Sequence, residues 1–272
     1  MKLKTINDIK DITPVKVKKV DLKDVKGGDI LPLYSNVYCT ARKNSGKTNV
    51  IAHIIKECCD KHTKVFGIVP TYQKDLTWIA IIERLEKKKI PHEFYSHIND
   101  DDALNNILEQ IEDVVSSDED EDEDEEPQPQ ILRFEDEMRI KYKPRKPKKK
   151  SCRYCIILDD ASEQLKDKRV VSLLKRNRHH KCKVILSSQY ANDCSPQMHK
   201  NIDVHLIFKG LSEDKLKEFY KNCDVSVTFQ ELKEMYEACS EKYSFFYMNA
   251  HESDFRCKFN KKFILDDDDT KN

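Results

Sequence analysis

The sequence predicts an α/β fold with a mainly parallel central sheet flanked by helices, plus a C-terminal β-hairpin. Short apolar segments alternate with segments of helical periodicity over most of the chain, and two further strand-like segments follow near its end. Alternating strands and helices indicate βαβ units, whose crossover helices cover the faces of a parallel sheet. A length of 272 residues suits one such domain with additions.

The predicted strands are apolar runs bounded by polar or turn-forming residues. In chain order, the sheet strands cover residues 33–40, 64–71, 153–160, 183–189 and 203–210, and the hairpin strands cover residues 242–250 and 254–260.

The predicted helices have apolar residues three or four positions apart, as Ile51, Ile54, Ile55 and Cys58 are in the first of them. These helices cover residues 49–61, 76–85, 101–115 and 165–177, a short segment after Pro196, and residues 212–222 and 228–239.

Two charged segments interrupt the pattern. Residues 118–126 are nine consecutive acids, and residues 139–153 contain nine Lys or Arg. Such segments bury too little apolar area to offset their ordering entropy, so residues 116–151 are predicted to be a disordered insertion. The predicted organisation is a Lys-rich N-terminal arm (1–30), a domain interrupted by this insertion (31–265) and an acidic tail (266–272).

The composition excludes several classes of protein. No apolar run exceeds five residues, far below the ~18 that a membrane helix needs, and the first twenty residues lack a secretory signal pattern. The ten cysteines lie mostly in apolar runs, which indicates reduced thiols in an intracellular protein. Cys152 and Cys155 lack a second pair, so zinc binding with His179 and His180 is not predicted.

Residues 41–49, Ala-Arg-Lys-Asn-Ser-Gly-Lys-Thr-Asn, follow a predicted strand and begin a predicted helix. Such a loop directs backbone N–H groups and the positive helix end at a phosphate. We expect Lys47 to reach the β- and γ-phosphates and the Thr48 hydroxyl to bind Mg²⁺. The predicted nucleotide-binding residues of this P-loop are Lys43, Asn44, Ser45, Gly46, Lys47, Thr48 and Asn49.

Ala41 stands where the P-loop pattern has glycine. A left-handed conformation there would cost alanine about 1–2 kcal/mol, whereas any other conformation would make the change harmless. The sequence leaves both alternatives open.

The apolar run Cys155–Leu158 ends in Asp159 and Asp160. Ligands of open α/β sheets bind at the carboxyl ends of the strands. We expect Asp159 to belong to the Mg²⁺ site and Asp160 to orient or deprotonate the attacking water. The alternative for either acid is an N-cap of the next helix.

A second strand, 183–189, ends in Gln189, whose amide is expected to sense the γ-phosphate or position the water. A turn residue that hydrogen-bonds the backbone is the alternative. Arg176 and Arg178 precede this strand, and Arg178 is the better candidate for a cation that completes a neighbouring subunit's site. The alternative is a solvated C-terminal helix turn.

The order of these motifs resembles the viral genome-packaging ATPases of poxviruses, giant viruses and their smaller relatives, in the FtsK-HerA superfamily of P-loop NTPases. The most specific segment is 176–210, with an Arg-His stretch, a strand ending in Gln189, a Pro-bearing turn and a strand ending in Phe-Lys-Gly. The resemblance covers about residues 33–260.

The resemblance implies a RecA-like core, a homo-oligomeric ring, and ATP-driven movement of double-stranded DNA into a preformed capsid. It implies ATP and Mg²⁺ as cofactors, capsid or portal-like proteins as partners, no membrane association, and an intracellular location at the site of virus assembly and in the virion. Lys47, Thr48, Asp159 and Gln189 match the family's site residues, whereas Asp160 stands where many members have Glu.

Two other functions remain open from the sequence. A small-molecule or nucleotide kinase would share the P-loop but transfer the phosphate to an acceptor, and a nucleotide-binding assembly module would not hydrolyse it. For a motor, the basic segment 139–150 and the N-terminal arm are the candidates for DNA contact.

Overall fold

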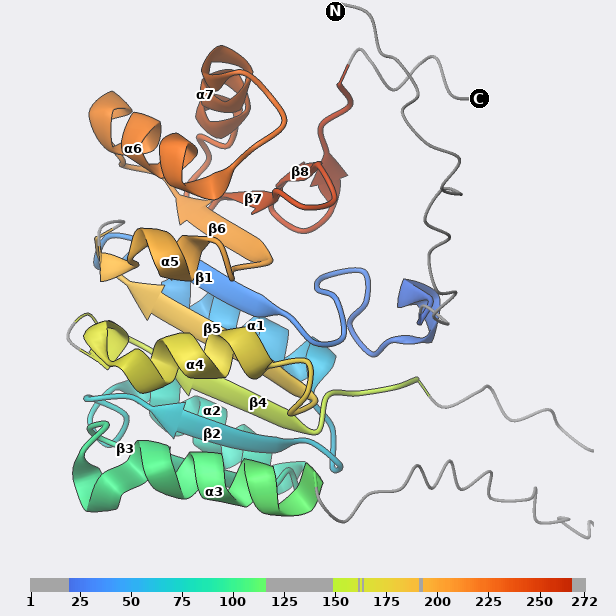
Figure 1. The fold of residues 1–272 in the computed structure, drawn as a ribbon, viewed down its shortest axis with the longest axis vertical. Coiled ribbons are helices and arrows are strands. Elements are labelled where there is room, and N and C mark those ends of the chain that lie inside the picture. The colour runs from blue at the N-terminus through green and yellow to red at the C-terminus, as the bar shows by residue number, and fades with distance from the viewer. Residues whose placement is uncertain (1–19, 116–148, 161, 163, 191–192, 266–272) are drawn as a thin grey trace, which may run out of the picture.

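A computed structural model describes residues 20–115, 149–160, 162, 164–190 and 193–265. Its described strands form one nine-stranded sheet in the order β3-β2-β4-β5-β1-β6-β7-β8-β9 (Figure 1). The strands are β1 (Asn36–Thr40), β2 (Lys64–Ile68), β3 (His92–Tyr95), β4 (Tyr154–Leu158), β5 (Cys182–Ser188), β6 (Val204–Phe208), β7 (Phe245–Asn249), β8 (Asp254–Cys257) and β9 (Lys261–Lys262).

The first six strands in the chain pair in parallel, and β6 to β9 pair antiparallel. The P-loop follows β1, which lies between β5 and β6. Strand β5 therefore separates β1 from β4, the strand that precedes Asp159 and Asp160. The predicted fold class, a mainly parallel sheet flanked by helices with a C-terminal hairpin, is confirmed.

Helices cover both faces of the sheet. In Figure 1, α1 and α2 lie behind it and α3, α4 and α5 lie in front of it, whereas α6 and α7 lie at the antiparallel end. The helices are η1 (Leu22–Asp24), α1 (Lys47–Cys58), α2 (Leu76–Lys87), η2 (Asp100–Asp102), α3 (Ala103–Val115), η3 (Gln164–Lys166), α4 (Lys168–Arg176), α5 (Pro196–His199), α6 (Glu213–Cys223) and α7 (Phe229–Ala238).

Every residue of β1, β4, β5 and β6 is buried, because the sheet is covered on both sides. Ile51, Ile54 and Trp78 from α1 and α2 pack on one face. Ile107 from α3 and Leu173 from α4 pack on the other. Strands that are buried on both faces carry continuous apolar runs, which is why the sequence predicts them.

The structure also differs from the predicted elements. The edge strand β3, His-Glu-Phe-Tyr, is not predicted by the sequence, because it is short, half of its residues are polar, and it is only half-buried. The predicted helix 165–177 is divided into η3 and α4, because Asp167 between them caps α4 by accepting a hydrogen bond from Arg169 N at 2.8 Å. A short strand, β9, extends the predicted hairpin.

The described residues at the ends of the predicted N-terminal arm and of the predicted insertion pack on the domain. Val25 is buried and forms a parallel bridge with Lys150. Lys26 N donates to Lys150 O at 2.8 Å, and Lys150 N donates to Asp24 O at 2.7 Å. The remaining parts of the predicted arm, insertion and tail, residues 1–19, 116–148 and 266–272, lie outside the described residues. Among the helices that the structure describes, none is long and apolar enough to cross a membrane.

Candidate nucleotide site

The loop between β1 and α1 adopts a conformation that requires glycine at one position. Gly46 has φ 93° and is the N-cap of α1, and Asn44 is left-handed with φ 61°. The turn is closed by Ser45, whose N and Oγ both donate to Arg42 O, at 3.3 and 2.7 Å. A Cβ at Gly46 would lie 3.0 Å from Tyr243 Cδ1, so both the backbone angle and the packing favour glycine.

Ala41 carries no strain in this structure. It is not among the described residues with positive φ, and its N–H donates to Ser188 O at 3.1 Å, in continuation of the β1–β5 pairing. The left-handed alternative left open by the sequence is therefore wrong, and alanine is compatible with the loop.

A cavity of about 1020 Å³ opens over the loop at the carboxyl ends of β1, β4 and β5. All seven predicted nucleotide-binding residues, 43–49, line it, as do Asp160 and Gln189. These residues come from distant parts of the chain, and they meet because the three strand ends lie at one edge of the parallel sheet.

Lys47 is the charged centre of this cavity and is only 8% exposed. Its Nζ lies 3.2 Å from Asp159 Oδ1 and makes a short ion pair with Asp160 Oδ1. Burial alone would lower the pKa of Lys47, but the charges of Asp159 and Asp160 and their hydrogen bonds outweigh it and raise that pKa. Lys47 therefore stays cationic, and an entering phosphate would compete with the two carboxylates for it.

Asp159 is buried, and its carboxylate is held by donors on both oxygens. Trp78 Nε1 donates to Oδ2 at 2.9 Å, and Ser187 Oγ donates to Oδ1. Carboxylate and hydroxyl oxygens are ligands that Mg²⁺ prefers, so Asp159 and Thr48 have the chemistry of the predicted magnesium site, although Thr48 lines the cavity and Asp159 lies buried behind it. Trp78 carries no sequence signal for this role, whereas Ser187 is one of the polar residues that end the predicted strand 183–189.

Asp160 faces the cavity with a side chain that is 47% exposed. Its φ is 52°, and its N donates to Ser187 Oγ at 3.2 Å. It does not cap α4, because Asp167 occupies that position. A carboxylate that reaches both Lys47 and the open cavity is suited to accept a proton from a bound water.

Gln189 and Arg178 lie beyond opposite ends of β5. Gln189 follows the strand, is exposed, and lines both the main cavity and a smaller one beside Arg42 and Tyr190. Arg178 precedes the strand and pairs with Asp203 at 3.0 Å, and Asp203 accepts from Asn36 N at the start of β1. The structure therefore does not bring Arg178 to the cavity of its own chain.

The antiparallel end of the sheet supplies cavity walls that the motifs do not predict. Tyr243 and Phe245 line the cavity from one side of the hairpin, and Phe259 and Asn260 line it from the other. Phe259 also stacks on His53 of α1, with ring centroids 5.9 Å apart. Aromatic rings and an amide beside a P-loop offer a surface for a planar base.

Comparison with solved structures supports the fold described above. The genome packaging NTPase B204 from Sulfolobus turreted icosahedral virus 2, solved with AMP, superposes with a TM-score of 0.51 at 17% identity, covering 86% of this chain and 100% of B204. B204 from Sulfolobus Turreted Icosahedral Virus, described as a DNA-packaging ATPase, gives a TM-score of 0.53 at 16% identity, covering 82% and 96%. The fold is that of B204. The predicted resemblance to viral packaging ATPases is thus confirmed at the level of the fold.

Two other comparisons are more limited. The pCW3 conjugation coupling protein TcpA, solved with ATPγS, has a TM-score of 0.50 at 10% identity, covering 87% of this chain and 62% of that one. The uncharacterized protein 075L of Invertebrate iridescent virus 6 is 40% identical over 70 residues, and the match spans only 25% of this chain and 27% of that relative. No protein-family model matches the sequence.

Proposed function

We propose that this protein is an ATPase that drives double-stranded DNA into a preformed viral capsid. The observation that carries the proposal is the placement of Lys47 between Asp159 and Asp160, over a P-loop, on a B204-like fold. A buried cation with two acids at the carboxyl edge of a parallel sheet is the arrangement that phosphoryl transfer needs.

In the proposed reaction, the loop N–H groups and Lys47 bind the β- and γ-phosphates of ATP. Thr48 and Asp159 would hold Mg²⁺, which neutralises phosphate charge when bound. Asp160 accepts the proton of the attacking water, and Gln189 orients that water by its amide. The aromatic walls of the cavity pack against the base, so the residues that contact the base differ from those that act on the phosphates.

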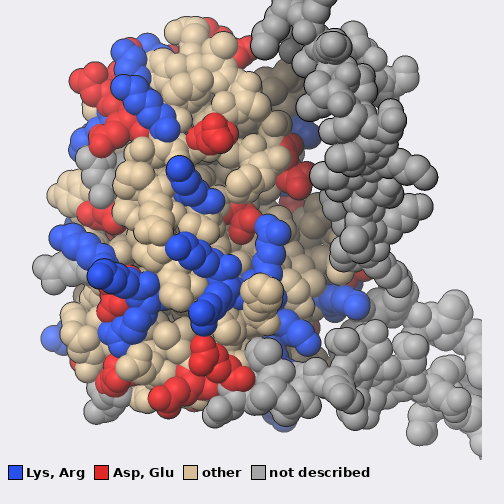
Figure 2. Space-filling view, in the orientation of Figure 1, with Lys and Arg blue, Asp and Glu red and all other residues tan. Residues whose placement is uncertain are grey.

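DNA contact is proposed to use cations outside the cavity. Figure 2 shows Lys and Arg side chains across the face that α4 covers. Lys175 and Arg176 of α4 are exposed, and 63% of the Arg176 side chain is accessible. Cations on one face suit the phosphate backbone of DNA. These side chains are therefore candidates for DNA contact, together with the basic segment 139–150 and the N-terminal arm.

A homo-oligomeric ring is part of the proposal, with Arg178 entering a neighbouring subunit's cavity. The exposure of Arg178 supports that role, since it lies at the end of β5 that points away from its own P-loop. Capsid or portal-like proteins at an intracellular assembly site are the proposed partners.

The deciding experiment measures ATP hydrolysis with and without double-stranded DNA, beside the native mass of the assembly. We expect DNA to stimulate hydrolysis and the mass to be a multiple of 32.0 kDa. With a nucleotide kinase, nucleoside monophosphates rather than DNA would stimulate ATP turnover. With a non-catalytic module, wild type and Lys47→Ala would hydrolyse ATP at the same negligible rate. Either result would overturn the proposal.

A further inference from the structure

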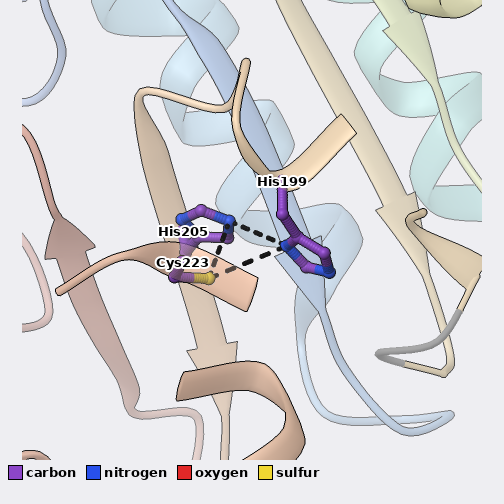
Figure 3. Close-up of side chains that lie close together, drawn as sticks. All are labelled: His199, His205 and Cys223. Atoms are coloured by element: carbon purple, nitrogen blue, oxygen red, sulfur yellow. Dashed lines mark hydrogen bonds between the residues drawn. The ribbon is translucent and has the colours of Figure 1, made fainter. Parts of the chain in front are cut away.

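Three buried side chains that could bind a metal converge away from the nucleotide cavity (Figure 3). His199 is the last residue of α5, His205 belongs to β6, and Cys223 is the last residue of α6. They are 3%, 1% and 7% exposed, and none of them lines the cavity. Three separate elements thus direct nitrogen and sulfur atoms at one point.

The distances among these atoms match the edges of a tetrahedral site. Zinc binds histidine nitrogen at about 2.0–2.1 Å and thiolate sulfur at about 2.3 Å, so tetrahedral angles separate two nitrogens by about 3.3 Å and nitrogen from sulfur by about 3.5 Å. His199 Nδ1 and His205 Nε2 are 3.2 Å apart. Cys223 Sγ lies 3.8 Å from the first and 3.6 Å from the second.

Aromatic rings enclose the cluster. Tyr38 meets both imidazoles edge-on, with centroids 5.8 and 6.3 Å away, and Phe219 does so at 5.3 and 4.9 Å. Burial of all three side chains is typical of structural sites, since catalytic sites keep a position accessible to substrate.

The donor set of the cluster suits zinc. Two imidazole nitrogens and one thiol sulfur select zinc over Mg²⁺ or Ca²⁺, which prefer oxygen.

We propose that His199 Nδ1, His205 Nε2 and Cys223 Sγ bind one zinc ion. The ion joins α5 and α6 to the sheet strand β6, and so fixes α6 to the nucleotide-binding part of the sheet. Because the ligands come from separate elements, metal binding contributes to the stability of the folded state.

The test measures zinc in the full-length protein after dialysis, and the absorption spectrum after exchange for Co²⁺. We expect about one zinc per chain and a thiolate-to-cobalt charge-transfer band. Cys223→Ser should reduce the zinc content and the intensity of the cobalt band at least about tenfold. Removal of zinc from the wild-type protein should lower the melting temperature by about 5 °C or more.

Cys239→Ser is the matched control, because Cys239 is also buried but lies outside the cluster. It should keep both the zinc and the band. Cys59→Ser tests the separate thiol group formed with Cys152 and Cys155 and should also keep them. If Cys223→Ser does not fold, the zinc content and the cobalt spectrum of the wild-type protein still test whether the cluster binds a metal. Wild-type protein without zinc and without the band, or equal losses in the controls, would show that the cluster is only a hydrogen-bonded part of the core.

Discussion

Trp78 and Asp159 are joined by a 2.9 Å hydrogen bond from the indole Nε1 to the carboxylate Oδ2. Trp78 is 1% exposed and Asp159 is 2% exposed, so neither can exchange this partner for water. The bond fixes the carboxylate that the proposed magnesium site needs. Helix α2 is therefore part of the site, although it contributes no motif.

Trp78→Phe should keep an aromatic ring but remove the donor. Leaving a buried acceptor unpaired costs about 1–3 kcal/mol, and the freed carboxylate should lower the hydrolysis rate by about tenfold. Urea unfolding and the turnover rate check the two effects. Ile81→Val, in the same helix, should lower stability by about 1 kcal/mol without changing turnover.

Lys47→Ala should weaken ATP binding by about 100-fold, because it removes the buried cation that pairs with phosphate. Calorimetric titration with an ATP analogue measures this. Lys56→Ala, at an exposed position of the same helix, is the control and should bind as the wild type does. Unchanged affinity in Lys47→Ala would contradict the assignment of the loop.

Asp160→Asn should retain ATP binding but lose hydrolysis by at least about 100-fold, since an amide cannot accept the proton. Single-turnover hydrolysis at saturating ATP separates this effect from binding. Retained turnover would move the general base to another residue.

Phe259→Ala should weaken ATP binding by about 10-fold while leaving pyrophosphate binding unchanged, because it removes a stacking surface worth about 1–3 kcal/mol per base. Parallel titrations with the two ligands test this. Equal losses for both would indicate a general collapse of the cavity wall rather than contact with the base.

Ala41→Gly should leave turnover within about twofold of wild type and lower stability by about 0.5–1 kcal/mol, since glycine adds unfolded-state entropy without relieving strain. Steady-state hydrolysis and urea unfolding measure both. A marked gain in turnover would show that alanine does limit the loop.

Local patterns predict the part of the site that a short segment encodes. Gly46, Lys47 and Thr48 are recognisable because their spacing on a strand–loop–helix unit is fixed by phosphate geometry. Asp159 and Asp160 are predicted at the sheet edge because they end a buried strand, and the structure places both against Lys47.

The remaining parts depend on tertiary packing. Tyr243 and Phe259 reach the loop only because β7 and β8 extend the same sheet, and nothing in their own segments indicates a nucleotide. The edge strand β3 has no sequence signal for a similar reason, since its stability comes from pairing with β2 rather than from an apolar run. His199, His205 and Cys223 likewise meet through folding, not spacing.

Tyr243 lies so close to Gly46 that a Cβ at position 46 would be 3.0 Å from its ring, which brings the first and last thirds of the chain together. Little room is therefore left between the loop and the residue that leads into β7. The hairpin thus bounds the space above the loop, so a substitution in β7 or β8 can alter nucleotide binding without touching the P-loop sequence.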